Sequence, residues 1–383
     1  MQYPTGISQR TWSTTVSEPI TATLLRENLT APLWLITSPP MAILAQQLSS
    51  QSVPNNARTT LQPLDTEYLD TGGGHSDSVN SFKYYAPTTG WWLLRGAIPY
   101  SGATTNSNYS FGAGIQVNQA GAVNYDGARH PGPPVAGAVV IPGFCELAHL
   151  TAQSPVTSSD EVQAYAYQDT GGSASTAINA GVGVFPWMSA RWAGVSGGTA
   201  GLAVPSPAAF SDTTEITGAY LNGTLRDAIN FLAFPPMARL SNSGASQSVP
   251  GTGADTAVTW NSGSFNGVAS DNYSGWSSGS NPTRYTFPVA GRYYVWGQVS
   301  FAASNSGQWG CGLRVNGTTS WYGTRTSAPG TSAAGLITTA EKYLRVSAGD
   351  YVEVTGSQTT GSSVSLNTIA PSYSKLIVLW RGA

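Results

Sequence analysis

Two short segments have the Gly-x-Ser-x-Gly spacing that surrounds the nucleophile of many serine hydrolases, at residues 194–198 and 275–279. In those enzymes the serine occupies a sharp turn between a buried strand and a helix, where its hydroxyl can reach a histidine base. Here both segments lie in loops rich in glycine and serine. In a chain with 44 glycines such matches arise freely, so the sequence predicts no serine nucleophile.

Histidines and cysteines also fail to form a recognisable catalytic or metal-binding pattern. The three histidines, His75, His130 and His149, all lie in the first half of the chain and lack the spacing of a zinc site. We interpret them as surface or loop residues. Cys145 and Cys311 are the two cysteines. They are expected to be buried thiols, with a bridge between the two halves as the alternative.

Carboxylates are scarce and do not occur in pairs suited to acid–base catalysis. Asp160 and Asp350 occupy matched places in the two halves, but each opens a strand pattern, where aspartate commonly forms a turn. Asp255 and Asp271 are isolated loop residues. A calcium site in these loops therefore stays an open alternative, while the sequence predicts no catalytic residue, no cofactor and no metal requirement.

The elements that must position these residues occur twice along the chain. Residues 50–54 and residues 246–250 are both Ser-Gln-Ser-Val-Pro, and residues 39–42 and 235–238 are both Pro-Pro-Met-Ala. Further matches follow in the same order at nearly constant spacing. This pattern indicates the tandem duplication of a module as long as a whole domain.

Composition favours an exposed, rigid β protein. Charged residues make up only 9% of the 383 residues, against about a quarter in typical soluble proteins. Hydrophobic residues make up 40%, and there are 12 tryptophans. A net charge of −2 predicts no attraction to nucleic acid. No apolar run reaches the roughly 18 residues of a membrane-spanning helix, and no secretory signal opens the chain.

Each module is predicted to begin with a short amphipathic helix. In the second copy, Asp212 and Glu215 form a capping signature, and apolar residues recur at helical spacing through residues 220–232. In the first copy, residues 24–29 have a similar pattern. Pro32 is expected to interrupt this first helix and keep it short.

The remaining pattern is that of short β-strands. In residues 291–301 apolar and aromatic residues alternate, which places Tyr293 and Tyr294 on opposite faces. Residues 316–317 are Asn-Gly, a hairpin signal, and the apolar run 375–380 indicates a strand buried on both faces. The sequence therefore predicts an all-β fold of two tandem β-sandwich or jelly-roll domains, each preceded by a short helix.

The duplication and the linker composition predict four segments. Residues 1–38 are an N-terminal arm and helix, and residues 39–194 are the first jelly-roll module. Residues 195–234 are a Gly/Pro/Ser linker and helix, and residues 235–383 are the second module. The two modules should share one strand order.

The second module resembles the jelly roll of the complement C1q and tumour-necrosis-factor family. Residues 285–301 and 344–354 carry the resemblance. In the first module, residues 90–94 match the early-strand pattern of this family. Residues 158–162 match less well, because they lack the glycine that should precede the aspartate. The resemblance implies jelly rolls that assemble as trimers through apolar and aromatic strand faces.

The helix segments are similar to a different group, the structural proteins of tailed phages of actinobacteria. Residues 215–232, followed by two prolines, resemble a sequence segment that precedes a C-terminal β module in those proteins. In them the segment follows a tryptophan-containing arm like residues 10–12. The resemblance implies a non-enzymatic protein on the exterior of the virion, in a tail fibre or minor tail component for host attachment. Residues 1–38 would contact other virion proteins.

Two other functions stay open. The protein could be a capsid decoration or head-fibre protein that stabilises the shell. It could also be a glycan-cleaving depolymerase, which the missing pair of carboxylates disfavours.

Aromatic residues of the second module are the candidate contact residues. Rings beside Ser, Gly and Asn supply rigid stacking surface for a host glycan, or they pack against another subunit. Outward rings would remain in water unless a neighbour covers them, which favours a homotrimer. The candidates for receptor or subunit contact are Trp276, Trp309, Trp321, Tyr322, Tyr294 and Trp296.

Overall fold

The structure is a computed structural model. The structure describes residues 31–46, 50–76, 78–101, 110–119, 121–131, 141–152, 160–169, 174–176, 185–195, 222–244, 246–265, 267–302, 307–328, 337–367 and 373–383.

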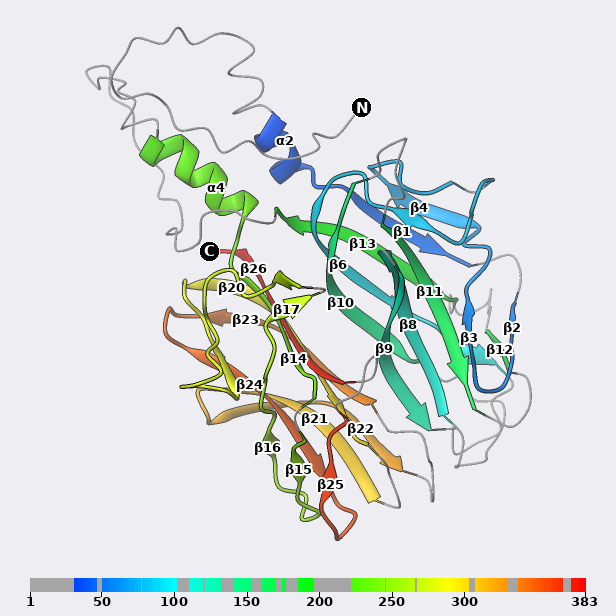
Figure 1. Cartoon of the computed structure of the whole chain (residues 1–383), viewed down its shortest axis with the longest axis vertical. Coiled ribbons are helices and arrows are strands. Elements are labelled where there is room, and N and C mark those ends of the chain that lie inside the picture. Colours follow the sequence, from blue (N-terminus) through cyan, green and yellow to red (C-terminus); the bar gives the residue numbers. More distant parts are fainter. Residues whose placement is uncertain are drawn as a thin grey trace, which may run out of the picture.

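The first module consists of short antiparallel sheets (Figure 1). One five-stranded sheet has the order β10 (Gly143–Leu150), β6 (Gly90–Ala97), β13 (Trp187–Gly194), β1 (Met41–Ala45) and β4 (Thr66–Asp70). A second layer has the order β9 (Gly121–Pro131), β8 (Ser110–Gln119), β11 (Glu161–Gln168) and β3 (Ala57–Thr60), with β5 (Tyr84–Tyr85) also on β11. A small sheet joins β2 (Ser52–Val53), β12 (Ala174–Thr176) and β7 (Tyr100–Ser101).

The second module has the corresponding sheets. One layer is β14 (Met237–Asn242), β26 (Ser374–Gly382), β20 (Gly291–Ser300) and β23 (Ile337–Val346). Because β23 pairs with β9, this layer and the second layer of the first module form one nine-stranded sheet. The other is β16 (Thr256–Ala257), β24 (Tyr351–Gln358), β21 (Gly307–Val315) and β22 (Thr319–Ala328), with β19 (Arg284–Thr286) on β24. The remaining pairs are β15 (Ser248–Val249) with β25 (Val364–Ser365), and β17 (Ser264–Phe265) with β18 (Val268–Ala269).

The two modules repeat one scheme of strand pairing. The order β1–β13–β6–β10 in the first module corresponds to β14–β26–β20–β23 in the second, and β3–β11–β8–β9 corresponds to β16–β24–β21–β22. The register also repeats, since Trp92 pairs with Trp192 and Tyr293 pairs with Trp380. The fold is therefore all-β, with two sandwich modules that are each preceded by a short helix. The Asn-Gly hairpin is also confirmed, because it joins β21 to β22.

The repeated Ser-Gln-Ser-Val-Pro segment has the same structural role in both modules. Gln51 donates through Nε2 to the carbonyl oxygen of Thr60 at 2.8 Å, and its Oε1 accepts from the backbone N–H of Gln62 at 3.0 Å. Gln247 makes the corresponding pair of bonds at 2.6 and 2.8 Å. Because one side chain satisfies a backbone donor and a backbone acceptor, it fixes the following segment to the module.

The first helix differs from its sequence prediction, whereas the second lies where the sequence predicted it. The first, α2 (Ala31–Thr37), contains Pro32 in its opening turn, so this proline begins the helix where the sequence predicted an interruption. Proline fits the first turn because its missing N–H has no partner there in any case. The second, α4 (Asp227–Ala233), follows the π-helical turn η2 (Asn222–Arg226). Residues 24–29 and 212–221 lie outside the described residues.

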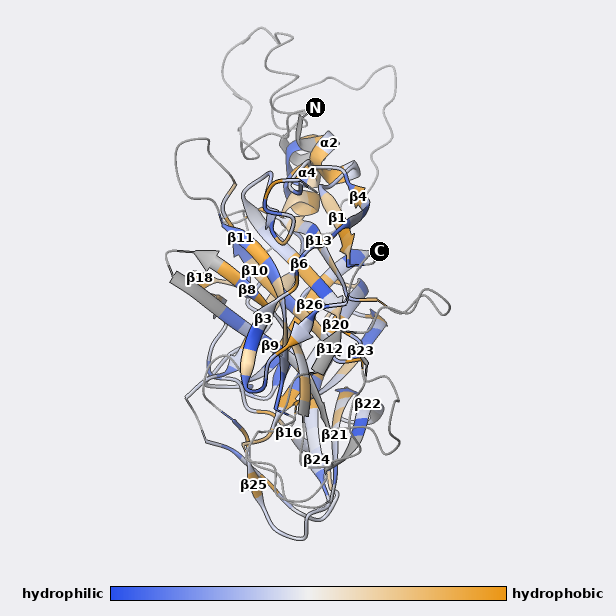
Figure 2. Cartoon of the chain, turned by 90° about the vertical axis from the view of Figure 1, so that its right-hand side faces the viewer, coloured by the Kyte–Doolittle hydropathy of each residue, from blue (hydrophilic) through white to orange (hydrophobic). Residues whose placement is uncertain are grey.

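Both helices lie at the same end of the molecule (Figures 1 and 2), where they contact each other. Helix α4 is fixed by Phe231, which is fully buried. The Phe231 ring packs edge-on against Trp380 at a centroid distance of 4.9 Å and against Tyr273 at 6.4 Å. These contacts attach the helix to β26 and to the loop between β18 and β19, which carries Tyr273.

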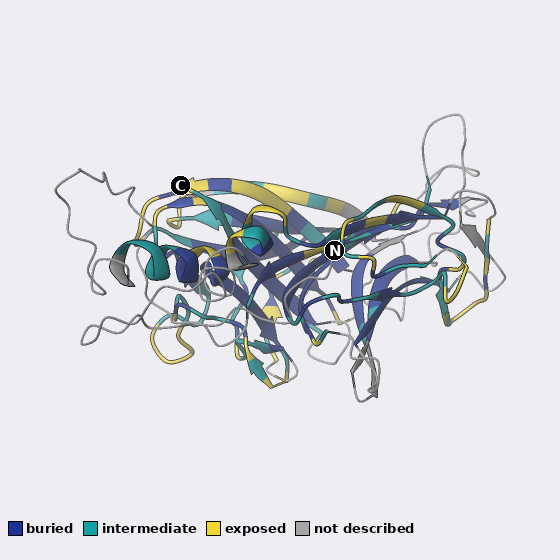
Figure 3. Ribbon diagram, turned by 90° about the horizontal axis from the view of Figure 1, so that it is seen from above, coloured by how far each residue is buried: buried dark blue, intermediate teal, exposed yellow. Residues whose placement is uncertain are grey.

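The face of β20 that the sequence predicted to point outward is covered by the first module. Tyr294 and Trp296 are only 1% and 5% exposed, and they belong to the same hydrophobic cluster as Trp91 and Leu93 of β6. Figure 3 shows the central strands as mostly buried. The expectation of outward rings is therefore wrong, because the neighbouring module of the same chain supplies the cover. The homotrimer is therefore no longer supported by exposed rings on β20. It stays a prediction, which light scattering can test.

Replacing Gly291 by alanine should lower the free energy of unfolding by about 1–3 kcal/mol. Gly291 has a φ of +145°, and Gly90, its counterpart in the first module, has +149°. A Cβ at Gly291 would overlap the indole nitrogen of Trp380. Urea denaturation measures the change. Gly279→Ala is the matched control, since nothing lies within 4 Å of a Cβ there. Equal stability of both variants would contradict the prediction.

Candidate functional site

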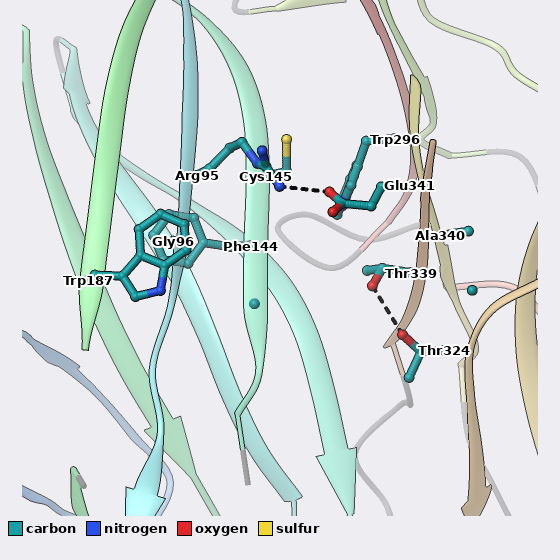
Figure 4. Close-up of a pocket in the computed structure, with 12 residues that line it drawn as sticks. Arg95, Gly96, Phe144, Cys145, Trp187, Trp296, Thr324, Thr339, Ala340 and Glu341 are labelled. Carbon is teal, nitrogen blue, oxygen red and sulfur yellow. Dashed lines mark hydrogen bonds and ion pairs between the residues drawn. The ribbon is translucent and has the colours of Figure 1, made fainter. Parts of the chain in front are cut away.

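A cavity of about 360 Å³ lies between the two modules (Figure 4). This volume falls at the lower end of the range for small-molecule sites, roughly 300–1,000 Å³. Strands β6, β10 and β13 line one side, and β20, β22 and β23 line the other. We call this cavity the inter-module cleft. Its lining residues are Arg95, Gly96, Gly143, Phe144, Cys145, Trp187, Trp296, Gly323, Thr324, Thr339, Ala340 and Glu341.

An ion pair crosses the cleft from one module to the other. Nη2 of Arg95 donates to Oε2 of Glu341 at 2.8 Å, and the hydroxyl of Tyr294 donates to the same oxygen at 2.9 Å. The guanidinium also lies over the Tyr294 ring, 5.1 Å from its centroid. Burial by itself would lower the pKa of Arg95, but its neighbours Tyr294, Cys145 and Glu341 outweigh burial and raise it. The two charges are therefore held in place and compensate each other.

Aromatic and hydroxyl groups complete the cleft. Trp187 and Phe144 form a wall on the side of the first module, and Thr324 and Thr339 face it from the second module (Figure 4). The two threonine hydroxyls are 3.4 Å apart. Trp187 is half-buried, and its indole N–H has no hydrogen-bond partner among the described residues. The cleft thus combines an apolar plane with groups that can both donate and accept hydrogen bonds.

Equivalent strand positions of the two modules meet in the cleft. Cys145 pairs with Arg95 across β10 and β6, and Glu341 pairs with Trp296 across β23 and β20. By the shared register, Arg95 corresponds to Trp296 and Cys145 to Glu341. Corresponding positions of the two modules therefore line one cleft, although the wider contact is not symmetric, since β23 pairs with β9, which is not its counterpart. Divergence after duplication has placed an arginine in one copy opposite a glutamate in the other.

A second charge network, next to the cleft, joins the modules in a fully buried position. Oε1 of Glu146 accepts from Nε of Arg239, and Oε2 accepts from Nζ of Lys375 at 2.9 Å. Lys375 also donates to the backbone oxygen of Asp126 at 3.2 Å. Burial would raise the pKa of Glu146, but Arg239 and Lys375 outweigh burial and lower it. The network connects β10 of the first module with β14 and β26 of the second.

The aromatic residues that the sequence proposed as contacts are not brought together on the surface. Trp309 is 0% exposed and packs edge-on against Phe301, so its assignment to a contact surface is wrong. Tyr294 and Trp296 are not on the outer surface either, because they are buried between the modules, where Trp296 lines the inter-module cleft. Trp276 and Trp321 are half-buried against the core of the second module. Tyr322, at 52% exposure, is the most exposed of the six.

The serine and the loop carboxylates weighed for catalysis and metal binding make hydrogen bonds within the second module. Ser196 lies outside the described residues, and Ser277 is an exposed turn residue whose hydroxyl accepts from the N–H of Ser280 at 3.4 Å. Asp271 accepts from the N–H of Trp276 at 2.9 Å, and Asp255 accepts from the Tyr322 hydroxyl at 3.0 Å. In the part of the chain that the structure describes, no three His, Cys, Asp or Glu side chains form a metal-binding group.

The matched aspartates and the cysteines agree with their sequence interpretation. Asp160 accepts from the backbone N–H of Thr151, and Asp350 accepts from that of Ser347, both at 2.7 Å. Both cysteines are buried free thiols, and burial raises the pKa of Cys145 to about 12. His149 departs from the sequence interpretation, because it lies in β10 against the Trp91 ring. Its pKa is lowered by burial, which outweighs the opposing effect of Asp160.

No sequence pattern marked the inter-module cleft. Arg95 and Glu341 are far apart along the chain, and neither belongs to a motif. One signal could have indicated them. In a chain with 9% charged residues, opposite charges occupy facing strands of the two copies, on the face that carries Tyr294.

Among helices built from the described residues, none has the length and apolar character needed to cross a membrane.

Comparisons with known proteins were made by sequence and by structure. No family model matches the sequence, and a search of curated proteins finds no match. Among solved structures, the chain is similar to the globular domain of zebrafish complement 1qA protein. The two are 15% identical, and the similarity covers 38% of this chain and 96% of that one, with a TM-score of 0.25. This likeness carries no information on what the chain binds.

Proposed function

We propose that this chain is a non-enzymatic structural protein on the exterior of a bacteriophage particle, with host attachment from a tail fibre or minor tail component as its role. The observation that carries the proposal is the position of both helices at one end of the β body (Figure 1). That arrangement supplies one end for attachment to the particle and leaves the opposite end, around β15, β16 and β25, to face outward.

The helix end has the character of a protein-binding surface. Leu33 of α2 and Leu232 of α4 are 42% and 37% exposed there. Beside them, Arg191 and Arg381 line a pocket, and neither makes an ion pair with another described residue. Burial, together with the like charge of Arg191, lowers the pKa of Arg381 to about 10. Apolar side chains next to two uncompensated cations suit an acidic segment of another virion protein.

The ionisable groups of the inter-module cleft favour binding over catalysis. Glycoside hydrolysis generally needs two carboxyl groups on opposite sides of the scissile bond, roughly 5–10 Å apart. Glu341 is the carboxylate that lines the cleft, and it is already paired with Arg95. The glycan-cleaving alternative therefore lacks a catalytic pair at this site.

Immunogold labelling of intact particles tests the proposal. An antibody against residues 239–383 should label the tail tip or its fibres, and pre-absorbing it with the purified chain should remove the label. Regular labelling over the capsid would favour the alternative of decoration or head fibres. Absence of the chain from purified particles, measured by mass spectrometry, would refute a virion role. Purified chain should also compete with particles for adsorption to host cells.

A further inference from the structure

We infer that the inter-module cleft is a binding site for a neutral sugar, a pyranose unit of a glycan. The inference names the ligand of the proposed attachment function and to that extent rests on it. Binding itself, however, depends only on the geometry of the cleft. The argument uses the aromatic wall, the polar groups still free to bond, and the local charge.

The aromatic wall fits the apolar face of a sugar ring. A pyranose presents axial C–H groups on one face, and such a face packs well against a flat aromatic side chain, which loses little conformational entropy on binding. Trp187 supplies a half-buried indole at the cleft, with Phe144 beside it (Figure 4). The floor between the two modules includes Gly96 and Gly143, which add no side chain to the space.

The polar groups fit the hydroxyls of a sugar, each of which both donates and accepts. Arg95 and Tyr294 both bond to Oε2 of Glu341, which leaves Oε1 without a partner among the described residues. The guanidinium of Arg95 has five N–H donors, of which one makes that bond. Adjacent ring hydroxyls can therefore accept from Arg95 while donating to Glu341. The hydroxyls of Thr324 and Thr339, 3.4 Å apart, offer two further partners.

The charge of the cleft argues against an anionic ligand. Arg95 is compensated by Glu341 at 2.8 Å. Lys342, the next residue on β23, directs its ammonium over the ring of Trp321, 5.8 Å from the centroid. Arg325 on β22 lies over the ring of Tyr322, at 4.4 Å. A phosphate or carboxylate would meet no uncompensated cation among the lining residues, whereas a neutral polyhydroxyl compound needs none.

The binding groups are also held in place before a ligand arrives. The cation–π contact and the ion pair fix Arg95, and the Tyr294 hydroxyl fixes the Glu341 carboxylate. The buried Glu146–Arg239–Lys375 network lies beside the cleft and fixes the two modules relative to each other. Prearranged groups lose less entropy on binding, which favours affinity for a small ligand.

Saturation-transfer NMR on the full chain tests the inference. The probes are methyl glycosides of glucose, galactose, mannose, rhamnose and N-acetylglucosamine, with methyl glucuronide and inorganic phosphate as anionic probes. We expect at least one neutral glycoside to give a saturable signal. Trp187→Ala and Glu341→Gln should each weaken its apparent Kd at least about tenfold. Tyr322→Ala, which removes an exposed ring outside the cleft, should leave the Kd unchanged.

The conservative double change Thr324→Val with Thr339→Val removes two hydroxyls while keeping side-chain shape, and it should also weaken binding if the fold is intact by circular dichroism. No saturable signal from any neutral glycoside would overturn the inference. So would binding of the anionic probes alone, or a signal that survives Trp187→Ala and Glu341→Gln. None of these results depends on particle labelling, so failure of sugar binding and failure of the virion role are distinguishable.

Discussion

Replacing Glu146 by glutamine should lower the free energy of unfolding by about 3–5 kcal/mol, because it leaves buried cations without their counter-charge. Glu146, Arg239 and Lys375 are each about 1–2% exposed, so water cannot replace the lost carboxylate. Urea denaturation followed by tryptophan fluorescence measures the change. The control is Glu67→Gln on β4, whose partly exposed carboxylate faces Nδ1 of His75 at 3.5 Å, and the loss of stability there should stay below about 1 kcal/mol.

The same residue predicts a pH dependence. The pKa of Glu146 in the folded protein is below its ordinary value, because the attraction of Arg239 and Lys375 outweighs burial. Its contribution to stability is therefore complete above the pKa of an unfolded glutamate, about 4.3, and is lost as pH falls through the lower folded-state pKa. Below pH 5 the wild type should lose stability more steeply than Glu146→Gln.

A triple variant tests whether the loss of stability comes from an unpaired buried charge. If Glu146, Arg239 and Lys375 are all replaced by methionine, no charge remains unpaired, and stability should stay near that of the wild type or rise. The modules would then be joined by an apolar contact of similar volume.

A loss below about 1 kcal/mol for Glu146→Gln alone would contradict the prediction, because it would mean that water reaches these groups.

Trp309→Ala should also lower the free energy of unfolding by about 3–5 kcal/mol, the range for removing a large buried aromatic side chain. Trp309 on β21 is 0% exposed, and its ring centroid lies 4.7 Å from that of Phe301. Differential scanning calorimetry and urea denaturation measure the loss. The sequence alone left Trp309 as a candidate for receptor or subunit contact, and an exposed ring in that role could be removed with little effect on stability.

Tyr322→Ala is the matched control within the same set of predicted contact residues. Its ring is 52% exposed, and its hydroxyl donates to Asp255 at 3.0 Å. Removal should cost no more than about 1 kcal/mol, the value of one hydrogen bond. If Trp309→Ala were as stable as Tyr322→Ala, the position of Trp309 in the core would be refuted.

The sequence by itself determined the duplication, the all-β class and several local features. The repeated segments predicted two modules, and the alternation in residues 291–301 separated Tyr293 from Tyr294. The Asn316–Gly317 turn followed from chemistry, because this dipeptide accepts the positive φ values that join two strands tightly, here 51° and 71°. These features depend on interactions between residues close in sequence, or on a period along one strand.

Only the tertiary structure decided which surface of each module is covered and by what. Strand periodicity assigns Tyr294 and Trp296 to one face of β20. It does not determine whether solvent, another chain or the other module contacts that face. Here the first module covers it, and this contact brings Arg95 to Glu341 and Glu146 to Lys375. These partners lie far apart in sequence. A charged residue does not recur at a regular spacing, so no sequence pattern identifies its partner. The inter-module cleft therefore exists only in the packing of the two copies.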